Sequence, residues 1–299
     1  MADPPVNGAL STAAPHNATD APHPRQRIPK TRFSRPTPPR DTTRIRIATL
    51  NTLTARDITQ RVMLTALCRN YHIDVLCVQE THLAETADVR HFNGYRLLLG
   101  PGVPCVHGDG RPTGNHRAGV GFLVHDDLYV SRTEFISANI AVLHLRCAEP
   151  PNQSGHHKAR VRNYHIVSVY APQRHNFSHP PSAEGAEFLS TLSATWQHVT
   201  CMPGAHFIAG DFNDAIVPAQ NDASTIHWLG DWAASYGLIE AFPNNQCVLP
   251  TWFQRRENEP PISSRTDSIL VPRGTFRRLS QQTTRLPIPG PATDHLMLM

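Results

Sequence analysis

The sequence predicts an α/β protein in which mixed β-sheets pack in layers with helices. From residue 44 onward, short apolar runs rich in β-branched residues alternate with stretches of helical periodicity. Several strand signals follow each other directly, which favours packed mixed sheets over a purely parallel winding. The chain has no G-x-G-x-x-G sequence after a first strand and no P-loop, so a nucleotide-binding doubly wound fold is disfavoured.

Each element is expected from its local pattern. Apolar runs predict strands at 45–50, 75–79, 119–125, 141–146, 164–170, 206–210, 267–271 and 296–299. One-sided apolar spacing predicts three helices, at 63–71 (with Met63, Leu64 and Leu67 on one face), at 188–199 and over about 223–236. Residues 101–118 are rich in glycine, proline and polar residues and are expected to form a long loop, as is the polar stretch 149–160.

The first 43 residues form a separate segment by composition. Residues 1–46 hold 9 of the 27 prolines and carry eight Lys and Arg against three Asp, whereas the remainder has a net charge of −1. A segment with so little apolar content is expected to be disordered. Such a basic tail either steers the protein to nucleic acid and into the nucleus, or is a solvated spacer. We therefore expect a tail at 1–43 and a folded domain at 44–299.

The cysteines and the hydropathy indicate an intracellular protein without a membrane partner. Six cysteines are scattered singly, and Cys68 and Cys77 lie in apolar runs, which predicts buried free thiols. No apolar stretch approaches the ~18–20 residues that span a bilayer, and the N-terminus lacks the apolar core of a secretory signal. Together with the basic tail, these features predict an intracellular, nuclear location.

Four of the expected strands end in polar residues that suit phosphate chemistry, namely Asn51, Glu80, Tyr170 and Asp211. A carboxylate at the end of a buried strand is costly unless a metal, water or a partner meets it there. Carboxylates and amides are the ligands that Mg²⁺ or Mn²⁺ prefers, whereas the histidines show no zinc spacing. The pattern indicates a metal-dependent phosphodiesterase.

Six segments of the chain, taken in order, resemble the signatures of the endonuclease/exonuclease/phosphatase (DNase I-like) superfamily. They are Thr49–Asn51, Val78–Thr81, Val169–Pro172, Gly210–Asn213, Arg265–Ile269 and Thr293–His295. Three stretches are most similar to the endonuclease domains of non-LTR retrotransposons, which accompany a reverse transcriptase: Cys77–Leu83, Pro250–Trp252 and Ser264–Asp267. The resemblance implies a four-layer α/β sandwich, with two packed mixed sheets flanked by helices and the strand ends meeting at one mouth.

The resemblance also implies a role for each site residue. Metal binding is assigned to Glu80, Asn51 and Asp294. Asp211 is expected to orient or deprotonate the attacking water, and Tyr170 to contact a phosphate oxygen or the leaving group. Phosphate binding is assigned to Asn213 and to a cationic His295, which Asp267 holds in place.

Three features separate this chain from parts of the superfamily. Apurinic endonucleases carry an acidic residue where this chain has Leu53, and many members have Asn where it has Gln173. Both differences weigh against repair of abasic sites. The chain also ends four residues after His295, so a short closing strand is expected to hold this histidine loosely.

The leading hypothesis is an endonuclease dependent on Mg²⁺ (or Mn²⁺) and of retrotransposon origin. It would bind the DNA phosphate backbone and nick one strand by metal-assisted attack of water, leaving a 3′-hydroxyl. One alternative is another phosphoesterase of the superfamily: an apurinic endonuclease, an RNase or a phosphoinositide phosphatase. The other is a degenerate module that binds nucleic acid without cleaving it. Around the mouth, Arg117 is a candidate DNA contact, and Trp252 is expected in the core. Arg255 and Arg256, between two strands, are either a contact to the DNA backbone or part of a solvated loop.

Overall fold

The structure, a computed structural model, describes residues 45–148, 161–178, 180–214, 227–241, 250–256, 259–264, 266–276, 279, 285–286 and 293–299. All of them belong to one compact unit, Arg40–Met299. The predicted disordered tail and the predicted loop at 149–160 lie outside the described residues, so both stay predictions.

Two large sheets form the centre of the unit. The first has seven strands in the order β16 (Arg285–Leu286), β17 (Met297–Leu298), β1 (Ile47–Asn51), β2 (Val75–Gln79), β7 (Val120–His125), β4 (Tyr95–Leu99) and β3 (Ala87–Phe92). The second has six, in the order β12 (Leu238–Glu240), β15 (Asp267–Pro272), β11 (Ala205–Asp211), β10 (Val161–Tyr170), β9 (Ile140–Ala148) and β8 (Tyr129–Ser137).

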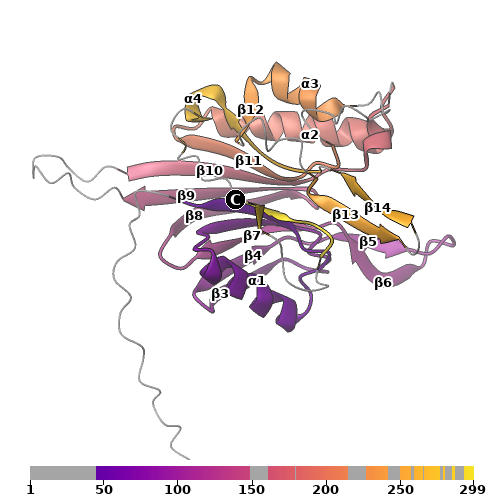
Figure 1. Ribbon diagram of the computed structural model, residues 1–299, viewed down its shortest axis with the longest axis horizontal. Coiled ribbons are helices and arrows are strands. Elements are labelled where there is room, and N and C mark those ends of the chain that lie inside the picture. Colours follow the sequence, from indigo (N-terminus) through magenta and orange to yellow (C-terminus); the bar gives the residue numbers. More distant parts are fainter. Residues whose placement is uncertain are drawn as a thin grey trace, which may run out of the picture. The chain divides into compact units, whose positions relative to one another are not determined.

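Helices cover the outer face of each sheet, so the unit has four layers (Figure 1). Helix α1 (Ile58–Asn70) packs on the first sheet, and α2 (Ala183–Thr200) and α3 (Trp228–Ser235) pack on the second. The short η1 (Arg174–Phe177) and α4 (Arg273–Phe276) complete the described helical residues. The predicted α/β sandwich is therefore confirmed.

The core lies in three apolar layers that follow from the period of two along each strand. Between the sheets, Phe122 of the first packs with Leu143 and Ile166 of the second. The helices bury the other faces, as in the packing of Trp196 against the second sheet. Among the described residues, no helix is long and apolar enough to cross a membrane.

The helices were predicted close to their observed positions, with one error in a buried face. Helix α1 starts at a cap in which Asp57 accepts a hydrogen bond from the Thr59 amide (2.8 Å). Leu64 and Leu67 are buried as expected, but Met63 is 40% exposed. Successive residues are about 100° apart around a helix, and this rotation carries Met63 past the edge of the buried stripe.

The expected loop at 101–118 is instead a β-hairpin, made of β5 (Val103–Val106) and β6 (Pro112–Arg117). A second hairpin, β13 (Trp252–Arg256) with β14 (Glu259–Ser264), places Arg255 and Arg256 in a strand rather than in a loop. Figure 1 shows both hairpins on the right of the view, beyond the strands of the two sheets.

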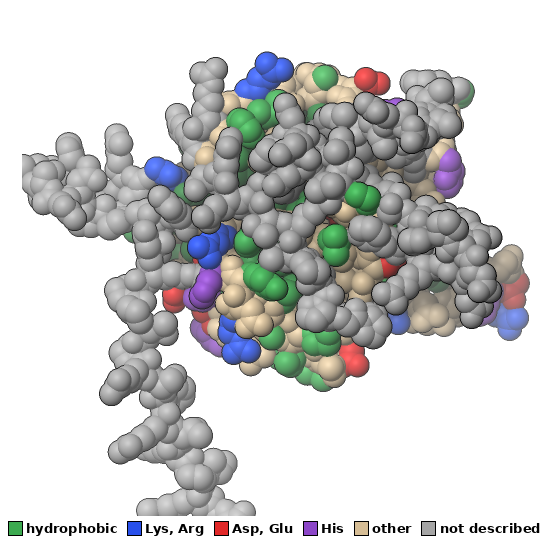
Figure 2. Space-filling view, in the orientation of Figure 1, with side chains coloured by type: hydrophobic (Ala, Val, Ile, Leu, Met, Phe, Trp, Pro, Cys, Tyr) green, Lys and Arg blue, Asp and Glu red, His purple; other side chains and the backbone are tan. Residues whose placement is uncertain are grey.

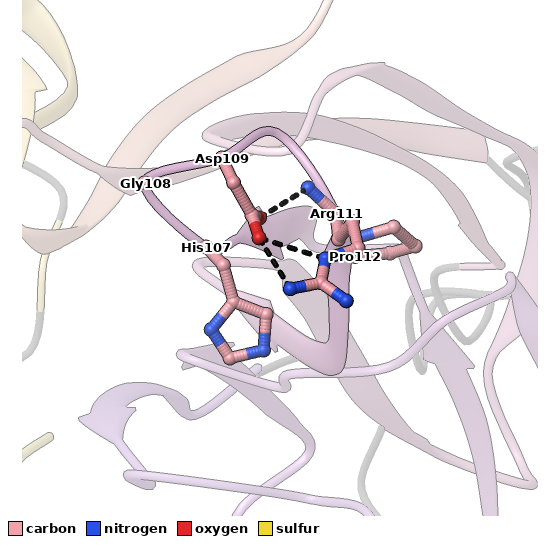
Figure 3. Close-up of a pocket in the computed structure, with 5 residues that line it drawn as sticks. All are labelled: His107, Gly108, Asp109, Arg111 and Pro112. Carbon is pink, nitrogen blue, oxygen red and sulfur yellow. Dashed lines mark hydrogen bonds and ion pairs between the residues drawn. The ribbon is translucent and has the colours of Figure 1, made fainter.

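A shallow hollow lies in the turn of the first hairpin, lined by His107, Gly108, Asp109, Arg111 and Pro112 (Figure 3). The Asp109 carboxylate is already paired with the Arg111 guanidinium, with 2.6 Å between Oδ2 and Nη2. Since one local turn supplies the whole lining, the hollow has no set of converging groups that would bind a substrate.

Two buried histidines interrupt the apolar face of the second sheet that α2 covers. His144 on β9 and His165 on β10 are cross-strand partners, each 6% exposed, and their Nδ1 atoms lie 2.7 Å apart. The other ring nitrogen of His144 lies 3.0 Å from Glu134 Oε1, and that of His165 lies 3.3 Å from the carbonyl oxygen of Pro203. The predicted buried free thiols, Cys68 and Cys77, are confirmed.

Candidate active site

Strand pairing brings the predicted polar strand ends to one side of the sandwich. In the first sheet β1 runs parallel to β2, and in the second β10 runs parallel to β11, so Tyr170 lies opposite Asp211. Strand β15 is antiparallel to β11 and places Asp267 opposite Asp211 on the other side. Carboxyl ends of parallel strands share one edge, which is why residues far apart in the sequence meet here.

The Asn51 side chain joins the two sheets at the site. Its Nδ2 donates to Glu80 Oε1 (3.1 Å) and to Asp211 Oδ2 (2.9 Å). Its oxygen accepts from the Leu53 amide (3.0 Å), which fixes the orientation of the side-chain amide. Asn51 therefore aligns two carboxylates, and its predicted role as a metal ligand stays a prediction.

Non-glycine residues with left-handed backbone cluster around this mouth. They are Leu53, Glu80, His82, Ala118 and Asn213, with φ between 50° and 58°. Each costs about 1–3 kcal/mol and persists only where the surroundings fix the backbone. Here the amides of Thr81 and His82 donate to the carbonyls of Gly119 and Ala118, at 3.1 and 3.0 Å. Such strain is typical of functional sites.

Glu80 is held as a carboxylate despite its burial. Burial by itself would raise the pKa of Glu80, but hydrogen bonds from His82, Tyr170 and Asn51 outweigh it and lower the pKa to about 2. The Tyr170 hydroxyl is one of these donors, and burial together with the charge of Glu80 raises the pKa of Tyr170 well above its ordinary value. The tyrosine therefore stays protonated and can donate a hydrogen bond.

Asp211, Asp267 and His295 form the second half of the site. His295 Nδ1 lies 2.8 Å from Asp267 Oδ2, and its Nε2 lies 3.8 Å from Asp211 Oδ2. Burial opposes a charged ring, yet the negative charge and hydrogen bond of Asp267, with the charges of Asp211 and Asp294, raise the pKa of His295 to about 10. Burial and repulsion by Asp267 raise the pKa of Asp211 above its ordinary value.

The oxygen atoms around this site fit a divalent cation. Asp267 Oδ1 and Asp294 Oδ1 are buried and accept no hydrogen bond from the described residues. Asp211, Asp267 and His295 have ligand atoms within 4.8 Å of one another, but a protonated ring bonded to Asp267 is a poor ligand. Carboxylate oxygens therefore remain as the donors, the type of ligand that hard divalent cations prefer.

Asn213 and Asp294 lie at the site but with part of their bonding capacity used. Asn213 Nδ2 donates to the Ala171 carbonyl (2.8 Å), and its backbone amide donates to Asp211 Oδ1 (2.9 Å). Asp294 Oδ2 accepts from the Trp252 indole nitrogen (2.7 Å), while Oδ1 lies 3.7 Å from His295 Nε2. Phosphate binding by Asn213 and metal binding by Asp294 stay predictions.

The expectation that His295 is loosely held is wrong. His295 is 5% exposed, and its backbone forms a bridge with Trp252. Next to it, the Thr293 hydroxyl donates to the Asn51 carbonyl (2.7 Å), and Leu298 pairs with Thr49 of β1. Although β17 has only two residues, contacts with β1, Trp252 and Asp267 fix the end of the chain.

Two site features could not be assigned a role from the sequence. His82 Nε2 lies 3.4 Å from Glu80 Oε2, and its position two residues after Glu80 was the available signal. Gly210 has no space for a side chain, because a Cβ would overlap the Val169 carbonyl of the neighbouring strand. The glycine thus lets β11 lie close to β10 just before Asp211.

The fold and the site define a phosphoesterase class, and the sequence comparison identifies the family. Residues 48–295 match the Endonuclease/Exonuclease/phosphatase family, so the chain belongs to it. This is a family of hydrolytic nucleases and phosphatases that depend on divalent metals. A search of curated proteins gave no match.

Solved structures share the fold at low sequence identity. The endonuclease domain of TRAS1, a telomere-specific non-LTR retrotransposon, is 16% identical over 85% of this chain and 96% of its own, with a TM-score of 0.53. The catalytic domain of Xenopus laevis APE2 is 15% identical over 84% and 90%, with a TM-score of 0.60. An AP endonuclease from Archaeoglobus fulgidus is 16% identical over 85% and 98%, with a TM-score of 0.57.

Proposed function

We propose that this protein is a Mg²⁺-dependent DNA endonuclease of retrotransposon origin that nicks one strand. The observation that supports it most directly is the double hydrogen bond of Asn51 Nδ2 to Glu80 and Asp211. This contact places the predicted metal ligand and the predicted base side by side, next to the Asp267–His295 pair. A degenerate module would have no reason to keep such a set aligned.

The chain's own residues supply three functions in this proposal. Asp211, with its raised pKa, accepts the proton of the attacking water near neutral pH more readily than an ordinary aspartate does. His295 stays an imidazolium and binds a phosphate oxygen. Tyr170, protonated and directed at Glu80, turns its hydroxyl to a phosphate oxygen or to the leaving group.

The divalent ion would be held by Glu80 and by Asp294 Oδ1, with Asn51 keeping Glu80 in place. When bound, such an ion would supply positive charge that offsets the charge of the phosphate and would favour deprotonation of water. Mn²⁺ fits the same oxygen donors.

DNA is the substrate that the surroundings of the site favour. Arg117 ends the β5–β6 hairpin, is exposed, and lies close enough for its charge to act on Tyr170, so it can contact a flanking phosphate. On the face drawn in Figure 2, the described Lys and Arg side chains are scattered rather than gathered in one patch. Affinity would then depend on a few arginines and on the basic tail, which also favours a nuclear location. Leu53 disfavours the apurinic activity.

A plasmid assay tests the proposal. Supercoiled plasmid is incubated with Mg²⁺ and the full-length protein, beside Asp211→Ala, His295→Ala and the surface control Asp88→Asn, which breaks an exposed pair with Arg96. We expect metal-dependent nicking that both site variants lose and the control keeps. A DNA polymerase that extends the nick confirms the 3′-hydroxyl.

Other outcomes point to the alternatives. DNA binding without nicking by the wild type indicates the degenerate module. If the wild type neither binds nor nicks DNA, the DNA proposal is contradicted. The same variants are then assayed on RNA and phosphoinositide substrates.

A further inference from the structure

Thr251 is a fully buried side chain that contacts the site without belonging to it. Its Oγ1 accepts two hydrogen bonds, from the amide of Thr266 (3.0 Å) and from the amide of Asp267 (3.1 Å). Both donors are buried at the start of β15, just where the Asp267 carboxylate turns toward His295. The hydroxyl of Thr251 therefore fixes the backbone that carries Asp267.

Residues 251 and 252 also contact the segment that carries His295, the hydrogen-bond partner of Asp267. The Thr251 carbonyl accepts from the Leu296 amide (2.7 Å), and Trp252 forms a backbone bridge with His295. The Trp252 indole nitrogen donates to Asp294 Oδ2 (2.7 Å), which leaves Oδ1 beside the site. Residues 251 and 252 thus contact Asp267 on one side and Asp294–His295 on the other.

This double contact matters because the two partners belong to different sheets. Asp267 starts β15 of the six-stranded sheet, whereas His295 precedes β17 of the seven-stranded sheet. Their 2.8 Å hydrogen bond crosses from one sheet to the other, and no strand ladder sets its length. Contacts outside the two sheets therefore have to hold the two segments at the right distance from each other.

We propose that Thr251 and Trp252 are positioning residues that form a clamp, which sets the Asp267–His295 distance and the orientation of Asp294. The inference rests on the proposed function, since the clamp serves the residues that would bind and cleave the phosphoester. Without the Thr251 hydroxyl, two buried amides lose their acceptor and the start of β15 has to move. A displacement of about 1 Å at a catalytic group can lower the rate about a hundredfold.

Isosteric variants separate positioning from folding. Thr251→Val keeps the shape and removes the hydroxyl, and Thr251→Ser keeps the hydroxyl. The matched control is Thr65→Val in α1, another fully buried threonine, whose hydroxyl donates to carbonyls of its own helix, Arg61 (3.1 Å) and Val62 (2.9 Å), and accepts from Asn93 Nδ2 (3.3 Å). Trp252→Phe removes the indole donor to Asp294 and keeps an aromatic ring.

Steady-state nicking and hydrogen exchange are measured on the full chain. We expect Thr251→Val to lower kcat about 10- to 100-fold with KM within about twofold, and Thr251→Ser to restore it. Trp252→Phe should lower kcat less, and Thr65→Val should leave it unchanged at a similar melting temperature. Equal losses of kcat in Thr251→Val and Thr65→Val, or no rescue by serine, overturn the clamp.

The hydrogen-exchange rates of the Thr266 and Asp267 amides test the clamp independently of any enzymatic activity. Exchange should be faster in Thr251→Val and unchanged in Thr251→Ser and Thr65→Val, because only the valine at 251 removes their acceptor. If the wild type cleaves no phosphoester, the proposed function fails while faster exchange still supports the clamp. Unchanged exchange in Thr251→Val overturns the clamp whatever the activity.

Discussion

Replacing Asp267 by asparagine tests the electrostatics of the site most directly. The change keeps the size of the side chain and an oxygen 2.8 Å from His295 Nδ1, but it removes the charge. Asp267 is the strongest influence that raises the pKa of His295 to about 10 from the ordinary 6.5. That difference corresponds to about 5 kcal/mol of preference for the charged ring.

The size and direction of the effect follow from the geometry. An adjacent opposite charge shifts a pKa by about 1–3. We therefore expect the pKa of His295 to fall by about 2 in Asp267→Asn, or about 3 kcal/mol. Because the folded-state pKa is raised, His295 contributes stability that is complete below pH 6.5 and is lost as the pH rises through about 10. In the variant the contribution is smaller, and its loss is complete at a lower pH.

Two measurements check this reasoning. An NMR titration follows the imidazole of His295, and urea unfolding between about pH 6 and 10 gives the free energy. The control is Asp126→Asn, which breaks a surface pair with His91 at 3.1 Å and should change the unfolding free energy by less than about 1 kcal/mol at every pH. If His295 still titrates near pH 10 in Asp267→Asn, the assignment of its charge to Asp267 is refuted.

Three further changes test other parts of the site. Mg²⁺ at about ten times its dissociation constant should stabilise the wild type by about 1.4 kcal/mol, or about 3–6 °C in Tm, and should not stabilise Glu80→Gln. Differential scanning fluorimetry measures this, and an equal shift in the variant contradicts metal binding by Glu80. Tyr170→Phe should lower kcat about 100-fold, as expected for the loss of a donor to the reacting group, and the lost hydrogen bond to Glu80 should destabilise the fold by about 1–2 kcal/mol. Gly210→Ala should destabilise the fold by about 3 kcal/mol in thermal unfolding, since its Cβ would overlap the Val169 carbonyl. Gly108→Ala, at a glycine with open space, should be neutral, and a neutral Gly210→Ala would contradict the close approach.

The sequence was sufficient to predict the strand ends because their signals are local. A buried strand such as Val75–Gln79 reads as an apolar run, and the polar residue that stops it is equally visible. The order of such strands therefore predicted α/β layers, and the resemblance of their polar ends to the family's signatures implied the four-layer sandwich and the residues gathered at the mouth. Parallel pairing of β1 with β2 and of β10 with β11 then accounts for their meeting.

What could not be predicted depends on contacts between distant segments or on weak local patterns. Asn51 and Asp211 are 160 residues apart, and nothing in either segment specifies that one amide joins both carboxylates. Thr251 acts through backbone amides, which carry no side-chain signal. The β5–β6 hairpin was predicted as a loop because its glycines and prolines suppress alternation, and pairing across an irregular register forms it nonetheless.

The buried row formed by Glu134, His144, His165 and the Pro203 carbonyl has hydrogen bonds that depend on how many protons it carries. Glu134, when ionised, and the Pro203 carbonyl are both acceptors, and His144 and His165 lie between them. The three contacts of this row need three N–H groups, but two neutral imidazoles carry two. The row is fully bonded only when it holds one extra proton, whose charge balances that of Glu134.

Burial lowers the pKa of His144, which opposes binding of the extra proton. Without that proton, one of the three contacts lacks a hydrogen. His165 lies five residues before Tyr170 on the same strand, about 16 Å away along β10. The sheet that carries Asp211 and Asp267 thus contains a second group of buried ionisable side chains, in the middle of β9 and β10 and away from the proposed active site.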